Sequence, residues 1–187
     1  MREKFPRGII KVTLKEVAAM NIHRLTLAGL LVAIGTLSAH LLYIPAGVAK
    51  CFPVQHAINV VAAVALGPSY AVGIAFTISL LRNLVGLGSL LAFPGSMLGA
   101  FLAAKLYAHF GSTKAAMLGE IVGTGFLGGL AAFPLSYYLL GKATVAWFFI
   151  PPFLISTLGG SIIAGLLLKS GALQTIAPQL FKKPSKN

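Results

Sequence analysis

The charge-free stretch Cys51–Leu81, CFPVQHAINVVAAVALGPSYAVGIAFTISLL, decides the class of fold. It is longer than the roughly 20 residues that an α-helix needs to cross the hydrocarbon core of a bilayer. The Gly67-Pro68 pair in its middle interrupts a helix, because proline cannot continue the hydrogen bonding of the preceding turn. We therefore expect two helices here, a short one near Val54–Leu66 and a longer one from Pro68 to about Val85.

Four further charge-free stretches flank this one, and each reaches or exceeds the length of a membrane-spanning helix. They are Leu25–Ala49, Asn83–Ala104, Ile121–Gly141 and Ala143–Leu168. Gly86, Gly88 and Phe93-Pro94-Gly95 predict a loop, and the helix after it is expected to end near His109. The sequence therefore predicts an all-α integral membrane protein, with a compact bundle of six transmembrane helices forming a substrate-binding domain over residues 24–169.

The composition agrees with a membrane location. Hydrophobic residues make up 57% of the chain and charged residues 10%, whereas a soluble domain has about a quarter charged residues. The net charge of +12 comes from basic residues between and outside the apolar stretches, not from a patch interleaved with exposed aromatic residues. We therefore expect a lipid bilayer, and no nucleic acid, as the partner of this charge.

The distribution of Lys and Arg predicts the orientation in the membrane. If both ends lie inside, twelve of the 15 basic residues fall on the cytoplasmic side, and only Lys50, Arg82 and Lys142 fall on the other. This asymmetry predicts cytoplasmic termini. We expect residues 1–23 to form a cytoplasmic tail or an interfacial segment, with a translation start at Met20 as the alternative, and residues 170–187 to form a basic cytoplasmic tail.

The short helix near Val54–Leu66 predicts a cavity. About 13 residues at 1.5 Å each span roughly 20 Å, less than the ~30 Å hydrocarbon core. Its outer end should therefore stop below the surface, with Tyr43–Pro53 folded over it. Non-helical backbone at such depth is tolerated where it is buried in protein or lines a cavity. A cavity near the outer face follows.

Three polar side chains on this short helix point to a ligand. Asn59 lies three residues after His56 and four after Gln55, so all three side chains can converge on one volume. Hydrogen-bonding side chains inside a membrane bundle need partners away from water. We expect them to contact a ligand, with Arg82-Asn83 as the rim of the site; the alternatives are hydrogen bonding between helices for the three and snorkelling to the outer headgroups for Arg82.

Aromatic and hydroxyl groups near the same face suit a flat aromatic ligand. The further candidate contacts are Phe52, Ser89, Phe93, Tyr137 and Trp147. For Tyr137 and Trp147, placed with Tyr138 on the last two helices, the alternative is an interfacial aromatic belt.

Glu120 is the only acidic residue within the membrane portion. It lies about six residues after Lys114, or roughly 9 Å from the cytoplasmic end, while Arg82 lies roughly 21 Å along its own helix from the same side. We therefore expect no direct pair between Glu120 and Arg82. Packing or hydrogen bonding to a neighbouring helix is the favoured role of Glu120, and a proton-coupling carboxylate is the alternative.

The motifs of enzymes and ATPases are missing from the sequence. It has no HExxH, no CxxC, no paired intramembrane carboxylates and no GxxxxGK[ST] nucleotide loop. We expect no catalytic activity, metal or cofactor in this chain, and active transport would need energy from another subunit.

Pairs of small residues four apart predict close approach between helices. They are Gly29 and Ala33, Gly95 and Gly99, Gly119 and Gly123, and Gly125 and Gly129.

Four stretches carry a resemblance to a known family: Lys50–His56 (KCFPVQH), Ser79–Asn83 (SLLRN), Gly88–Ser96 (GSLLAFPGS) and Gly119–Gly125 (GEIVGTG). They resemble the ThiW family of substrate-binding (S) components of energy-coupling factor (ECF) transporters, over about residues 24–168. The resemblance implies capture of hydroxyethylthiazole, the thiazole precursor of thiamin, at a prokaryotic plasma membrane. It also implies a transmembrane coupling subunit and two ATPase subunits that use ATP, with Gly29 and Ala33 facing the coupling subunit.

Two other classes of function stay open at this point. One is a stand-alone secondary transporter that uses Glu120 for proton coupling, and the other is a small membrane-embedded enzyme, which the missing catalytic groups disfavour. The charges also predict the ligand: with Glu120 assigned to the cytoplasmic half and Lys50 and Arg82 at the rim, the cavity should prefer the neutral thiazole alcohol to the cation thiamin.

Overall fold

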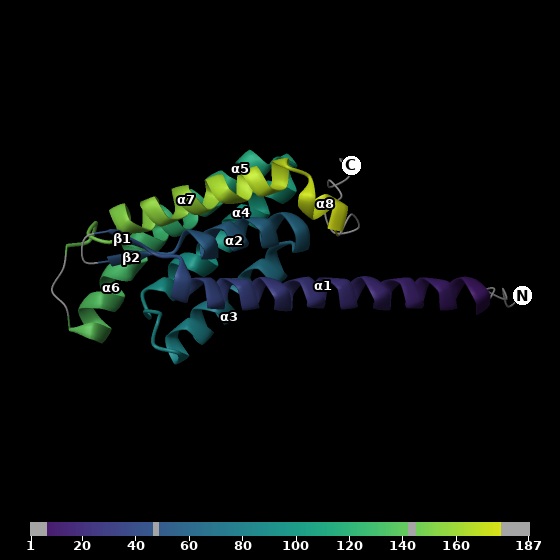
Figure 1. Ribbon diagram of the computed structural model, residues 1–187, viewed down its shortest axis with the longest axis horizontal. Coiled ribbons are helices and arrows are strands. Elements are labelled where there is room, and N and C mark those ends of the chain that lie inside the picture. The colour runs from purple at the N-terminus through teal and green to yellow at the C-terminus, as the bar shows by residue number, and fades with distance from the viewer. Residues whose placement is uncertain (1–6, 47–48, 142–144, 177–187) are drawn as a thin grey trace, which may run out of the picture.

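The computed structural model of the protein describes residues 7–46, 49–141 and 145–176. Within these ranges it is a helical bundle with one two-stranded hairpin (Figure 1). The elements are α1 (Arg7–Leu41), β1 (Ile44–Ala46), β2 (Ala49–Cys51), α2 (Pro53–Leu66), α3 (Pro68–Leu84), α4 (Ala92–Phe110), α5 (Thr113–Glu120), η1 (Ile121–Gly128), α6 (Gly129–Leu140), α7 (Ile150–Lys169) and α8 (Ala172–Ile176).

The predicted break between the second and third helices is confirmed. Helix α2 has 14 residues and ends at Gly67, whose φ of 82° lies in the left-handed region that glycine adopts readily. Pro68 then begins α3, at the first helical position, where its missing N–H leaves no hydrogen bond unmade.

The segment between α1 and α2 is non-helical, as predicted, but it forms a β-hairpin within a fold predicted to be all-α. Ile44 pairs with Cys51 in antiparallel register, and the helix of the charge-free stretch Leu25–Ala49 ends at Leu41. The backbone N–H of Phe52 donates to Ser156 Oγ at 2.8 Å, so the start of α2 is tied to α7. The hairpin lies at the end of the bundle opposite α8 (Figure 1).

Two local predictions were wrong. Phe93-Pro94-Gly95 lies in the first turn of α4, where proline is tolerated, so the loop is shorter than expected. Trp147 lies in a turn before α7, not on the last helix. In addition, α5, η1 and α6 follow one another as a continuous helix, which begins at Thr113 and contains π-helical turns over Ile121–Gly128.

The close packing predicted from small residues is confirmed between α4 and the helix α5–η1. A Cβ atom on Gly123 would lie 2.5 Å from the Cα of Gly99, and one on Gly119 would lie 2.6 Å from the backbone nitrogen of Ala103. A Cβ atom on Gly128 would likewise collide with the Cα of Gly95. We call this contact the α4–η1 seam, formed by Gly95, Gly99, Gly119, Gly123 and Gly128.

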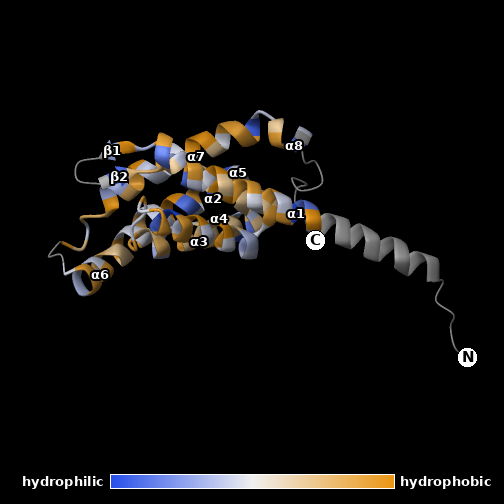
Figure 2. Ribbon diagram, turned by 60° about the horizontal axis from the view of Figure 1, so that its bottom comes forward, coloured by the Kyte–Doolittle hydropathy of each residue, from blue (hydrophilic) through white to orange (hydrophobic). Residues whose placement is uncertain are grey.

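The surface is that of a membrane protein. Among the described residues, three helices are long and apolar enough to cross a bilayer: Ile22–Leu41, Thr113–Leu140 and Ile150–Lys169. Large apolar side chains are exposed on the outside of the bundle, including Leu37, Phe76 and Leu166, and Figure 2 shows apolar residues along most of the helices. Exposed apolar surface on this scale is stable in lipid, not in water.

The predicted topology goes beyond these observations. Six transmembrane helices, cytoplasmic termini and the division at residues 23 and 169 stay predictions, although α1 runs without a break across residue 23. The beginning of α1 and α8 lie at the same end of the bundle (Figure 1). Several basic residues behind the topology prediction lie outside the described residues: Arg2, Lys4, Lys142, Lys182, Lys183 and Lys186.

Candidate functional site

A cavity of about 480 Å³ opens between the start of α2, the α3–α4 loop, η1 and the start of α7. Its volume falls in the range of small-molecule sites. It lies at the hairpin end of the bundle. The residues that line it are Lys50, Phe52, Gln55, His56, Arg82, Leu87, Gly88, Ser89, Leu91, Ala92, Ser96, Thr124, Ser136, Phe148, Phe149, Pro152, Phe153 and Ser156.

Half of the predicted ligand contacts line this cavity, namely Phe52, Gln55, His56, Arg82 and Ser89. The other five lie elsewhere. Asn59 is fully buried behind the wall, and Asn83 donates to Ser79 O at 2.8 Å. Phe93 packs against Phe76, while Tyr137 and Trp147 are exposed, as the aromatic-belt alternative expects. The binding roles of these ten residues stay predictions.

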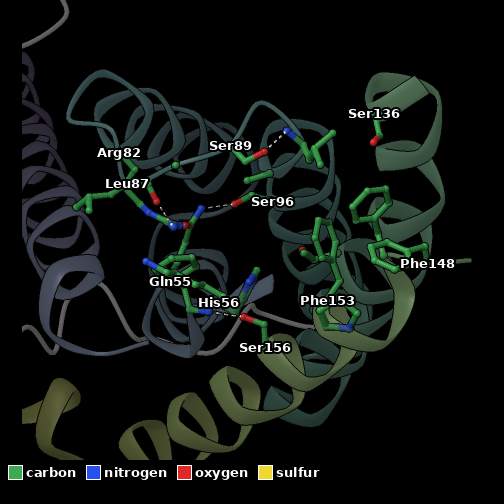
Figure 3. A pocket seen from close by; sticks show the side chains of 18 residues that line it. Gln55, His56, Arg82, Leu87, Ser89, Ser96, Ser136, Phe148, Phe153 and Ser156 are labelled. Atoms are coloured by element: carbon green, nitrogen blue, oxygen red, sulfur yellow. Dashed lines mark hydrogen bonds between the residues drawn. The ribbon is translucent and has the colours of Figure 1, made fainter. Parts of the chain in front are cut away.

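Sequence reasoning missed an aromatic wall formed by the turn before α7 and the first turn of α7. Phe148, Phe149 and Phe153 line the cavity, and Figure 3 shows Phe148 and Phe153 across it from Arg82 and Gln55. The run of aromatic residues just before Pro151-Pro152 is the signal that could have revealed this wall. The serines of the wall carry no such signal, because serine is common in membrane helices.

Arg82 is buried in the wall. It is 3% exposed, and its Nη1 donates to Gln55 Oε1 while its Nη2 donates to Leu87 O at 3.3 Å. The guanidinium carbon lies 3.7 Å from the centre of the Phe52 ring, within range of a cation–π contact. Arg82 therefore does not snorkel to the surface.

Gln55 connects Arg82 to the next helix. Its Nε2 donates to Ser79 Oγ at 3.1 Å and to Ser96 Oγ at 3.0 Å, and Figure 3 shows it between Arg82 and Ser96. Both ends of this amide are therefore occupied. Gln55 both lines the cavity and joins α2 to α3 and α4, so the ligand-contact interpretation and the interhelical one apply together.

Glu120 lies directly behind His56. Its Oε1 is 2.8 Å from His56 Nδ1, 3.0 Å from Asn59 Nδ2 and 2.9 Å from Thr124 Oγ1. The predicted hydrogen bonding to a neighbouring helix is confirmed. Among the described residues, Arg82 donates to Gln55 and Leu87 and not to Glu120, in agreement with the prediction of no direct pair.

The prediction that no acid lies near the cavity is wrong, because His56 lines the cavity and contacts Glu120. The depth argument compared Glu120 with Arg82 only, and not with the residues of the short helix. Helix α2 starts further inside the bundle than the hairpin that precedes it (Figure 1), and His56 and Asn59 on it reach Glu120. Glu120 itself is fully buried and does not line the cavity.

The described part of the chain contains no group of three His, Cys, Asp or Glu residues that could hold a metal ion. The wall thus offers aromatic rings, hydroxyl groups, one imidazole and one buried guanidinium. This set can hold a flat heteroaromatic molecule by ring packing and a few hydrogen bonds.

Comparison with known proteins gives one match. Residues 25–174 match the model of a family described as thiamine-precursor transporter protein (ThiW). The chain belongs to the ThiW family. Every residue that lines the cavity falls within the ThiW match. No curated protein and no solved structure matches the chain.

The ThiW assignment agrees with the membrane character of the surface and with a small-molecule substrate. The family is described as one of transporters. The resemblance noted from the four sequence stretches is therefore confirmed at the level of the family.

Proposed function

We propose that this ThiW protein is the substrate-binding subunit of an ECF-type importer in a prokaryotic plasma membrane, and that it captures hydroxyethylthiazole from outside. The cavity at the hairpin end supports the proposal, because the predicted topology puts that end outside. Energy comes from two ATPase subunits through a transmembrane coupling subunit, since the sequence has no nucleotide loop of its own.

The lining of the cavity supports a neutral thiazole. The rings of Phe148, Phe149 and Phe153 offer faces for a five-membered aromatic ring. Among the described residues of the wall there is no carboxylate, while Arg82 and Lys50 are both basic. A thiazolium cation such as thiamin would lose hydration without gaining an opposite charge in contact.

The face of α1 that carries Gly29 and Ala33 supports a coupling subunit as the partner of this chain. Gly29 and Ala33 are exposed, and Gly29 lies in an open groove with Ala28, Gly73 and Thr77. Small residues let a second helix approach closely in a membrane. We assign this face to the coupling subunit.

Uptake by reconstituted vesicles tests the proposal. Labelled hydroxyethylthiazole is offered to vesicles with the chain alone, with the chain plus the coupling and ATPase subunits, and with ATPases whose nucleotide-loop lysine is replaced. We expect binding by the chain alone but accumulation only in the complete complex with intact ATPases. Accumulation by the chain alone would contradict the proposal.

One observation favours a second candidate, a proton-coupled transporter. Glu120 is a buried carboxylate 2.8 Å from a residue of the cavity wall, a position suited to coupling proton and substrate. Vesicles with the chain alone and an imposed pH gradient decide between the candidates. Accumulation that follows the gradient and is lost in Glu120→Gln would favour this second function.

A further inference from the structure

We infer that Glu120 is a positioning residue that holds the proton of His56 on Nδ1, so that His56 Nε2 accepts a hydrogen bond from the ligand. The inference deepens the proposed function and rests on it: the cavity selects heteroaromatic molecules that carry a hydrogen-bond donor. Glu120 acts through His56, because it is fully buried and has no surface in the cavity.

The hydrogen bonds around Asn59 identify Glu120 Oε1 as an acceptor. The backbone carbonyl of Ser96 can only accept, and it lies 3.3 Å from Asn59 Nδ2, which fixes the orientation of the Asn59 amide. The same amide nitrogen lies 3.0 Å from Glu120 Oε1 and therefore donates to it.

His56 Nδ1 is a further donor at this oxygen. Three polar atoms lie within 3.0 Å of Oε1, from His56, Asn59 and Thr124, whereas Glu120 Oε2 is buried with no hydrogen-bond partner in the described part of the chain. All hydrogen bonding of the carboxylate thus converges on Oε1. An oxygen with these neighbours accepts hydrogen bonds, and the matching His56 atom is an N–H donor.

The second ring nitrogen of His56 remains for the cavity. The His56 side chain is 11% exposed and lines the cavity, and Nε2 has no hydrogen-bond partner among the described residues. With the proton on Nδ1, neutral His56 presents a lone pair at Nε2. Gln55, the other polar side chain of α2 in the wall, has both ends of its amide occupied by Arg82, Ser79 and Ser96.

This arrangement discriminates between parts of the proposed ligand. A thiazole ring nitrogen only accepts, so it cannot pair with an unprotonated Nε2. The hydroxyl of the hydroxyethyl group can donate to it. The hydroxyl is therefore the group that His56 recognises, and the analogue with a plain ethyl group leaves Nε2 unpaired.

Titration of the purified full chain with hydroxyethylthiazole and with its ethyl analogue tests the inference. We expect the wild type to prefer the alcohol by about tenfold or more. In Glu120→Leu, which removes the acceptor of the His56 proton, the preference should fall below about threefold, with the affinity for the ethyl analogue nearly unchanged, and His56→Ala should behave alike. Glu120→Gln keeps an amide oxygen as acceptor at the Oε1 position and should keep the preference. Ser161→Ala is the control, because Ser161 is buried and polar but lies outside the cavity wall.

An equal loss of affinity for both compounds in Glu120→Leu would overturn the inference, because a merely structural role affects both alike. It would leave the proposed function standing. Failure of both compounds to bind a folded wild-type chain would instead contradict the proposed function.

A second readout needs no ligand and no change at Glu120. Nitrogen-15 NMR of histidine-labelled wild type, with His56 assigned by His56→Ala, reports which ring nitrogen carries the proton. We expect a protonated Nδ1 and an unprotonated Nε2. A protonated Nε2 would overturn the inference whatever the titrations give.

Discussion

The α4–η1 seam and the outer face of α1 carry the same sequence pattern and use it differently. In the seam, a Cβ atom on Gly123 would lie 2.5 Å from the Cα of Gly99, so two helix backbones touch. On α1, a Cβ atom added to Gly29 would have no heavy atom of another part of the chain within 4 Å. Small residues four apart thus indicate a close approach, but they do not say whether the approaching helix belongs to the same chain.

The polar groups near the seam bond to other helices, whereas those near Gly29 bond within their own helix. In the seam, Thr124 Oγ1 lies 2.9 Å from Gly95 O on α4, and Glu120 bonds to α2. In the groove beside Gly29, the hydroxyl of Thr77 donates back to Gly73 of its own helix. The seam therefore holds the wall of the cavity in place, while the α1 face is left for lipid or a partner.

The largest expected effect is that of a large side chain in the seam. Gly99→Leu should prevent stable folding, because a Cβ atom at Gly99 already meets Thr124 and lies 2.6 Å from Glu120 Oε2. Thermal unfolding in detergent measures this. Gly73→Leu is the matched control, with open space around Gly73, and should leave the unfolding temperature unchanged or slightly raised. Equal effects of both changes would remove the distinction between the regions.

A smaller effect is expected when one hydroxyl is removed. Thr124→Val should lower the free energy of unfolding by about 1–2 kcal/mol, because the buried hydrogen bonding with Gly95 and Glu120 is lost. Thr77→Val makes the same change at an exposed site and should stay within about 0.5 kcal/mol. Denaturant unfolding of the two variants gives the comparison. A larger loss of unfolding free energy for Thr77→Val than for Thr124→Val would contradict the distinction between the two regions.

The smallest effect on the isolated chain is expected on α1. Gly29→Leu combined with Ala33→Leu should change the free energy of unfolding by less than about 0.5 kcal/mol and leave ligand binding intact. The same variant should lose uptake in the complete transporter, since the coupling subunit can no longer approach. Binding is measured by titration and uptake in reconstituted vesicles. Loss of both together would place these residues in the packing of the chain itself.

The sequence predicted the parts of the fold that local chemistry determines. Gly67-Pro68 separates two helices because of what glycine and proline do to a backbone, in any surroundings. Counting charge-free residues placed the start of the fifth helix at Ile121, eight residues too late. A buried acid such as Glu120 is stable inside the bundle only through donors on other helices, which hydropathy cannot detect.

The site was harder to predict, because it joins residues that are distant in the sequence. His56 and Glu120 are 64 positions apart, and their contact depends on how deep α2 begins. Trp147 and Phe148 are neighbours with similar chemistry, yet the turn before α7 leaves Trp147 exposed and sets Phe148 in the wall. Composition predicts an aromatic residue near the cavity, but only the path of the backbone selects which one.

Competitive titration of the purified chain with hydroxyethylthiazole and thiamin tests most directly whether the cavity takes a neutral thiazole. Its described wall has no carboxylate, Arg82 and Lys50 are basic, and Glu120 is screened from the cavity behind His56. The alcohol should bind at least tenfold more tightly, a difference of roughly 1.4 kcal/mol or more. Equal or tighter binding of thiamin would contradict the claim that the cavity takes a neutral thiazole.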